Sequence, residues 1–238
     1  MSAKHQYFYP CKDLISPEER KELNELARAV MSESSQKDVV ALKSDYTSLY
    51  NIQKTIDKWR EQNNLPKDND EYTKNNIPKW VGKNNPDFLG INEPIVTKLF
   101  GEENSNLIWN IANRYGGSGW RLMISYNDKG QLPIHHDPRI GPQSNLNLPV
   151  YPDYAFYRPT NFHNSYERDD IAYSIDYKVL RSPCLINMSK LHSAGDFFEP
   201  TNEYYNGQSV SVQIMFLGKY QDTLKRFQSK GWLSTTFH

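Results

Sequence analysis

The chain has 238 residues, of which 37% are hydrophobic and 13% aromatic, enough for a packed core and too apolar for a disordered chain. Lys plus Arg equals Asp plus Glu at 28 each, so no global charge field indicates nucleic acid or an anionic membrane as partner. The two cysteines form no disulfide framework or metal motif, and the sequence shows no signal-like leader or membrane span. We therefore expect a single domain over residues 1–238, located in the cytoplasm.

Residues 1–115 are expected to form a mainly helical support region. Ser16 followed by Pro17 and two glutamates predicts a helix start, and the helix should continue to about Met31. A second helix is predicted over residues 45–63, followed by a polar loop over 64–85. A third is predicted over residues 93–115, with a break near Gly101.

After residue 116 the pattern changes to short β-prone runs separated by turns. Strands are predicted over residues 120–126, 132–136, 146–150, 172–179, 184–188 and 210–217. The segment 151–170 is expected to be a long polar connection, and residues 222–228 a final helix. This layout predicts an α+β fold with an antiparallel barrel or sandwich, such as a jelly roll, over residues 116–220 and a helix or tail over 221–238.

The candidate metal ligands begin with His135 and Asp137. Residues two apart on a strand point to the same side, so these two side chains can converge on one ion at the end of their predicted strand. Two imidazoles and one carboxylate leave three positions open on an octahedral metal, which suits iron(II) in enzymes that activate oxygen. The same ligand set can also serve catalytic zinc.

The second imidazole has to come from another part of the chain. His192 is the best candidate because it follows the apolar run 184–188 and precedes an expected turn at residues 193–195. His163 is expected in a polar loop with no strand to fix it, and His5 and His238 lie near the frayed ends of the chain.

From residue 120 to residue 217 the chain resembles the 2-oxoglutarate- and iron(II)-dependent oxygenases. A Tyr-x-x-x-Gly turn from Tyr126 precedes the His-x-Asp triplet in that superfamily, and a distal His follows on a later strand, where this chain has Leu191-His192-Ser193. The closest likeness is to aspartyl/asparaginyl β-hydroxylase-like and prolyl-hydroxylase-like members. The resemblance implies a double-stranded β-helix (jelly-roll, cupin-like) core braced by N-terminal helices.

The same resemblance implies an activity. His135, Asp137 and His192 would be the catalytic metal ligands, with Fe(II) and 2-oxoglutarate as cofactors. O2 and a small-molecule or peptidyl substrate would be the partners. Decarboxylation of 2-oxoglutarate to succinate and CO2 would be coupled to hydroxylation of that substrate, because the family's halogenases lack the carboxylate that Asp137 supplies.

The chain departs from the family where the distal carboxylate of 2-oxoglutarate should bind. The strand after His192 carries no Arg or Lys, although Ser211 could offer a hydroxyl there. A buried dicarboxylate needs a fixed cation, for which Arg121 is a candidate beside Arg139 and Arg181. Tyr126 and Asn147 are further candidates for contacts with the cosubstrate.

Two other functions stay open on the sequence. The missing cation also fits a catalytically inactive β-barrel that binds a ligand or serves as a structural protein, such as one from a phage. A zinc hydrolase using the same three ligands lacks an evident Glu general base beside the triplet.

Overall fold

The computed structural model describes residues 3–45, 88–127, 132–135, 142–152, 159–167, 169–194 and 208–234. The predicted helix over residues 45–63, apart from its first residue, and the predicted loop over 64–85 lie outside these ranges. So does Asp137. In the described ranges no helix is both long and apolar enough to cross a membrane.

The predicted N-terminal helix is confirmed as α1, Pro17–Val30. Ser16 Oγ accepts a hydrogen bond from Glu19 N at 3.2 Å, and Glu19 Oε2 accepts one from Ser16 N at 2.9 Å. This reciprocal capping box satisfies backbone donors that a helix start otherwise leaves unpaired. A further helix that the sequence pattern did not predict, α2 (Glu33–Asp45), follows directly.

The predicted third helix is two helices. They are α5, Glu93–Phe100, and α6, Glu102–Arg114, separated at Gly101, whose φ of 92° interrupts the helical backbone. The expected break near Gly101 is therefore confirmed. The C-terminal helix is also confirmed, as α8, Tyr220–Ser229.

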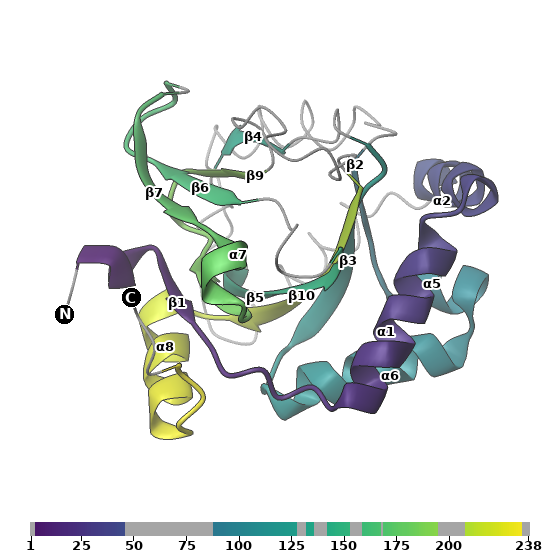
Figure 1. Cartoon of the computed structure of the whole chain (residues 1–238), viewed down its shortest axis with the longest axis horizontal. Helices are drawn as coiled ribbons and strands as arrows, with labels where there is room; N and C mark the ends of the chain where they lie inside the picture. Colours follow the sequence, from purple (N-terminus) through teal and green to yellow (C-terminus); the bar gives the residue numbers. More distant parts are fainter. Residues whose placement is uncertain are drawn as a thin grey trace, which may run out of the picture.

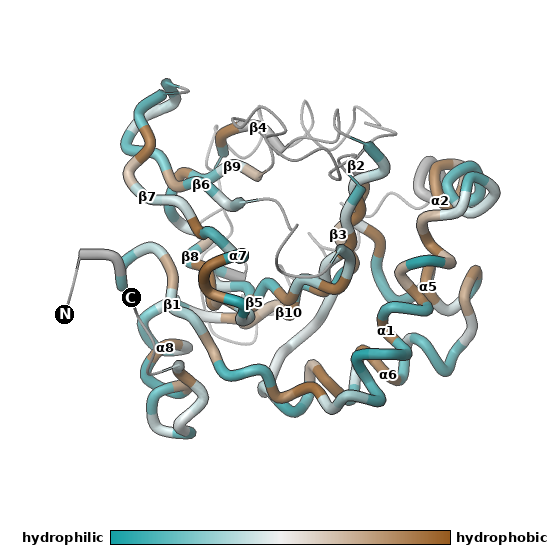
Figure 2. The backbone as a smooth tube through the Cα atoms, in the orientation of Figure 1, coloured by the Kyte–Doolittle hydropathy of each residue, from teal (hydrophilic) through white to brown (hydrophobic). Residues whose placement is uncertain are grey.

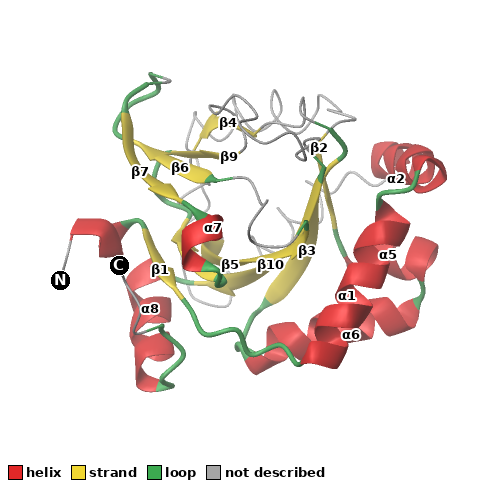
Figure 3. Ribbon diagram, viewed as in Figure 1, coloured by secondary structure: helices red, strands yellow, loops and turns green. Residues whose placement is uncertain are grey.

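The strands form two antiparallel sheets (Figures 1 and 3). The large sheet has six strands in the order β1-β8-β5-β10-β3-β2 and the small sheet four in the order β4-β9-β6-β7. The strands of the large sheet are β1 Phe8–Pro10, β2 Phe88–Ile91, β3 Gly119–Ser125, β5 Pro142–Tyr151, β8 Cys184–Asn187 and β10 Ser209–Leu217. Those of the small sheet are β4 Leu132–His135, β6 Thr160–His163, β7 Ile171–Ile175 and β9 His192–Ala194.

The chain crosses repeatedly between the two sheets. From β3 to β10 it visits the large sheet with β3, β5, β8 and β10, and the small sheet with β4, β6, β7 and β9. The α+β class with antiparallel sheets is confirmed. Among the described strands the two sheets stay separate and do not close into a barrel.

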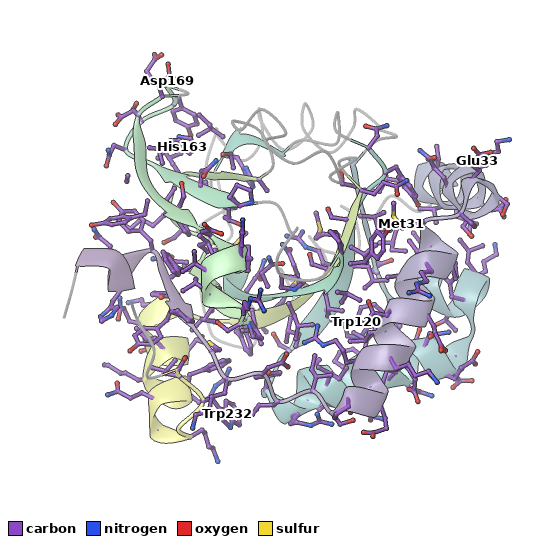
Figure 4. All side chains as sticks on the ribbon, viewed as in Figure 1. Met31, Glu33, Trp120, His163, Asp169 and Trp232 are labelled. Carbon is purple, nitrogen blue, oxygen red and sulfur yellow. The ribbon has the colours of Figure 1, made fainter. Side chains whose placement is uncertain are left out.

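One face of the large sheet packs against α1, α5 and α6, which lie along its outside in Figure 1. Alternate residues of β3 and β10, including Leu122, Ile124 and Val212, bury their side chains with Leu26 of α1 and Ile108 of α6. Figure 2 shows the apolar stretches of these helices beside the sheet, and Figure 4 places Trp120 between the sheet and α1. We call this side of the large sheet the outer face and the side toward the small sheet the inner face.

Three predicted segments differ from the structure. The connection over 151–170 contains β6, and the expected strand 172–179 ends at Ile175, where Asp176 caps the short helix α7, Tyr177–Leu180. Asp176 Oδ1 accepts a hydrogen bond from Lys178 N at 2.9 Å, and this N-cap favours a helix although the residues that follow are β-prone. The third difference is in the N-terminal region, which contributes β1 and β2 to the two edges of the large sheet.

Candidate functional site

Polar side chains form rows across the inner face of the large sheet. Gln213 of β10 lies in register with Arg121 of β3 on one side and with Asn147 of β5 on the other. Ser211, two residues earlier on β10, lies opposite Met123. The alternation of the strands thus brings three of the predicted cosubstrate residues, Arg121, Asn147 and Ser211, to the same face.

The hydrogen bonds on this face are incomplete. Arg121 Nε donates to Gln213 Oε1 at 2.8 Å, and Asn147 Nδ2 donates to Tyr177 Oη at 2.7 Å. Within the described part of the chain, the buried Ser211 Oγ and Asn147 Oδ1 have no hydrogen-bond partner, and Arg121 takes part in no ion pair. A buried polar atom without a partner costs about 1–3 kcal/mol, so these groups are suited to a polar ligand.

The two predicted histidine ligands lie side by side on the small sheet. His135, the last residue of β4, is the register partner of His192, the first residue of β9. Their ring centroids are 4.2 Å apart with an interplanar angle of 52°, and both side chains are buried. Nitrogens bound to one metal ion lie within about 4 Å of each other, since each metal–nitrogen bond is about 2.1 Å. The separation of the rings permits shared coordination.

The imidazole of His192 is oriented from both sides. Its Nδ1 lies 2.8 Å from the carbonyl oxygen of Lys190, and the ring of Phe162 is 6.4 Å away, centroid to centroid. A carbonyl oxygen can only accept, so Nδ1 carries the proton in this contact. The lone pair of the neutral ring then resides on Nε2, the arrangement that metal-binding histidines use.

The third predicted ligand, Asp137, lies outside the described residues. Among those that are described, no group of three or more His, Cys, Asp or Glu side chains gathers in metal-binding proximity. The structure thus brings together two of the three predicted ligands. No protein-family model and no curated protein matches this chain. Any function proposed for it rests on the residues themselves.

The prediction that His163 lies in a loop is wrong. His163 ends β6, its side chain is buried, and its Nε2 lies 2.8 Å from Ser193 Oγ, next to His192 in sequence. Burial lowers the pKa of His163, and the nearby His192 lowers it further. The sequence offered little signal here, because a four-residue strand with one apolar aromatic side chain, Phe162, resembles a polar loop.

The predicted cosubstrate residue Tyr126 lies elsewhere. It directly follows β3, its side chain belongs to the helix-side core cluster, and burial raises the pKa of its phenol. The alternation of β3 places it on the side opposite Arg121 and Met123. The structure therefore does not bring Tyr126 to the inner face. Of the other arginines considered, Arg181 is exposed at the end of α7, and Arg139 lies outside the described residues.

Proposed function

We propose that this protein is a non-haem iron(II) oxygenase that couples decarboxylation of 2-oxoglutarate to hydroxylation of a small-molecule or peptidyl substrate. One observation carries the proposal: His135 and His192, far apart in the sequence, are register partners with ring centroids 4.2 Å apart. Paired buried histidines at adjacent strand ends, with a carboxylate two residues after one of them, are the parts of a two-histidine, one-carboxylate iron site.

The strand order supports the double-stranded β-helix that this function implies. Between β3 and β10 the chain passes back and forth between two sheets, with β10 between β3 and β5 and with β9 between β4 and β6, and this order supports a jelly roll. In this fold the metal ligands would project from the small sheet toward the inner face of the large one. The helices on the outer face would brace the core.

The residues present fit an iron ion. His135 and His192 would bind it with Asp137, and the Lys190 carbonyl would hold His192 with its Nε2 toward the metal. Bound iron(II) supplies open coordination positions at which O2 and a chelating 2-oxo acid can react. The protein's own part is to orient these groups and to bury the site, since both imidazoles are nearly inaccessible to water.

The inner face would bind the far carboxylate of 2-oxoglutarate. Arg121 is the one charged side chain at the inward positions of the large sheet within the described ranges, and Gln213 Oε1 holds its Nε in place. Ser211 Oγ could donate a further hydrogen bond to the carboxylate. The Asn147 amide would shape the site through its bond to Tyr177. A guanidinium fixed in this way is a strong carboxylate ligand and would replace the cation missing from β10.

The metal part of the proposal is tested by anaerobic titration with iron(II), followed by 2-oxoglutarate turnover with succinate as the measured product. Wild-type protein should bind one iron and form succinate, and His135→Ala and His192→Ala should lose both. His5→Ala, in the N-terminal 3-10 helix η1 (Ala3–Gln6), is the matched histidine control and should behave as wild type. Turnover retained in both ligand variants would rule the proposal out. Hydrolysis supported by zinc without oxygen uptake would favour a zinc hydrolase. A protein that binds neither metal would favour a β-barrel without catalytic activity.

The cosubstrate part is tested with Arg121→Gln. Loss of a charged hydrogen-bonding partner worth about 1.5–3 kcal/mol should raise the KM for 2-oxoglutarate roughly tenfold to a hundredfold while iron binding is retained. Arg181→Gln removes an exposed arginine from α7 and should leave the KM unchanged. An unchanged KM in Arg121→Gln, with iron still bound, would move the carboxylate site away from β3.

A further inference from the structure

His163 contacts both sequence neighbours of His192. The backbone N of His163 donates to the carbonyl oxygen of Leu191 at 2.9 Å, and its Nε2 lies 2.8 Å from Ser193 Oγ. Strands β6 and β9 pair antiparallel here, with Phe162 opposite His192 and Asn161 opposite Ser193. Figure 4 labels His163 on the β6–β7 hairpin, below the tip that carries Asp169.

The contact with Ser193 lies on the side of the small sheet that faces away from the His135–His192 pair. Phe162 and His192 share one side of the sheet, so Ser193, the next residue, points to the other. The side chains of His163, His192 and Ser193 are 3%, 2% and 0% exposed. With so little water present to compete, the His163–Ser193 hydrogen bond is held in one geometry.

Strand β9 needs such support because it is only three residues long. Its first residue, His192, has to keep its ring beside His135, and small shifts of the strand would move the ring nitrogens out of range. On the inner side the Lys190 carbonyl and Phe162 restrict the ring itself. On the opposite side, the bonds from His163 restrict the backbone that carries it.

We propose that His163 is a positioning residue: it holds β9 through Ser193 and Leu191 so that His192 presents Nε2 to the metal beside His135. The expected effect of His163 on metal affinity rests on the proposed iron site, although the restraint on His192 exists in the metal-free protein. Side chains that orient a ligand indirectly typically change metal affinity by about 10- to 100-fold when they are removed.

The test uses His163→Phe, which keeps a planar ring but cannot bond Ser193, and His163→Gln, whose amide can reach the position of Nε2. Ser193→Ala removes the same bond from the other partner and serves if His163→Phe does not fold. Ser174→Ala is the matched control. It deletes a 2.7 Å side-chain bond to Asn161 in the same sheet, on the β7 side of β6, and leaves both bonds from His163 to β9 in place.

Two quantities are measured on the full chain. The first is the Co(II) dissociation constant under anaerobic conditions. It should rise about tenfold in His163→Phe and Ser193→Ala, less in His163→Gln, and not in Ser174→Ala. The second is the tautomer of His192 in metal-free protein, from 15N NMR of the imidazole nitrogens. Wild type, His163→Gln and Ser174→Ala should show a single Nδ1–H form, and His163→Phe and Ser193→Ala a mixture.

The two readouts separate this inference from the proposed function. Equal Co(II) affinity and an unchanged His192 tautomer in folded His163→Phe and Ser193→Ala would overturn the positioning role and leave the iron site standing. A wild-type protein that binds no Co(II) or iron(II) would overturn the proposed function. The tautomer measurement would then still decide whether His163 restrains His192.

Discussion

Along β3 and β10, the outer and inner faces of the large sheet are made by the same strands and differ in character, whereas the inner face at β1 and β8 has an apolar cluster of its own against the small sheet. On the outer face, Leu122, Ile124 and Val212 are fully buried in one apolar cluster with the helices. On the inner face, the alternating residues include Arg121 and Ser211, together with buried polar atoms that find no partner among the described residues. Register, strand length and hydrogen-bond ladder are common to both faces.

The contrast separates the side chains that stabilise the fold from the side chains that are available to bind a ligand. Apolar burial on the outer face contributes roughly 25 cal/mol for each Å² removed from water, which accounts for its composition without any ligand. An unpartnered buried hydroxyl or amide oxygen opposes folding by about 1–3 kcal/mol. The unpartnered polar positions of the inner face, such as Ser211 and the Asn147 oxygen, are therefore not explained by stability, and a polar ligand is the simplest reason for them.

The largest expected effect comes from deleting a side chain on the outer face. Leu122→Ala should lower the free energy of unfolding by about 2–5 kcal/mol, because it leaves a cavity in the helix-side core. Met123→Ala, the next residue on the inner face, is the control. Met123 belongs to neither apolar cluster, so its loss should be clearly smaller. Urea unfolding of both variants measures the difference, and equal losses would mean that the inner side of β3 is packed as tightly as its outer side.

Two glycines allow the packing of the two faces to be compared by adding a Cβ atom to each face. A Cβ on Gly117 would lie 2.3 Å from Ile214 Cγ2 and 3.1 Å from the Ala112 carbonyl oxygen, both on the helix side. Gly117→Ala should therefore destabilise by about 1–3 kcal/mol. The atoms nearest to a Cβ on Gly90 would be those of the flexible Met123 side chain, at 3.1 Å, and the Arg121 Cδ, at 3.9 Å. Gly90→Ala should lower the midpoint of thermal unfolding less than Gly117→Ala does. A larger loss in Gly90→Ala than in Gly117→Ala would contradict a tightly packed outer face.

The parts that could be predicted from the sequence are those set by local chemistry. The capping box at Ser16 and Glu19 places the start of α1, and the alternation of β10 places Ser211 and Gln213 on one face. The adjacency of His135 and His192 followed from the ends of two predicted strands and from the family resemblance. That Asp137 completes the site stays a prediction.

What could not be predicted depends on partners distant in the chain. Strand β6 exists because its four residues pair with both β7 and β9, and β1 is a three-residue strand fixed by β8. Neither carries enough periodicity of its own to be distinguished from a loop. Tyr126 is a different case: alternation along β3 puts residue 126 on the side opposite Arg121, so cosubstrate contacts from both residues were not compatible with one strand.

A smaller effect is expected where the helices of the outer layer meet solvent. Arg114 Nη2 lies 2.5 Å from Glu19 Oε1, and hydrogen bonding from Arg114 is the main cause that lowers the pKa of Glu19 below its ordinary value of 4.5. Because the folded pKa is lowered, this stabilisation is present above about pH 4.5 and is lost as the pH falls through the lowered value. After allowance for solvent screening it amounts to at most about 1 kcal/mol.

Glu19→Gln tests this contribution, since glutamine can still complete the capping box but carries no charge. At neutral pH the variant should be slightly less stable than wild type, and the difference in stability should disappear as the pH falls below the lowered pKa of Glu19 and its carboxylate is protonated. Glu25→Gln, in an exposed pair with Lys21 at 4.0 Å, is the control and should change little at any pH. A constant gap across the whole range would show that the Glu19 charge is not involved.

The smallest change in stability, and the sharpest comparison of the two faces, is expected for Ser211→Ala. Its hydroxyl is buried on the inner face without a partner in the described ranges, so its removal should leave the free energy of unfolding within about 0.5 kcal/mol of wild type or raise it. The control variant is Ser144→Ala, because Ser144 is a buried serine on the outer face. Ser144 Oγ donates to Thr223 Oγ1 at 3.1 Å in a buried setting, so this variant should lose about 0.5–1.5 kcal/mol.

For ligand binding the order of the two variants should be reversed, with the larger effect in Ser211→Ala. Ser211→Ala should raise the KM for 2-oxoglutarate several-fold, because one hydrogen bond to a carboxylate is lost, whereas Ser144→Ala should leave it unchanged. A stable Ser211→Ala protein with wild-type KM would remove Ser211 from the carboxylate site. A clear loss of stability in Ser211→Ala would show instead that its hydroxyl serves the fold, and the inner face would then need no ligand to explain it at this position.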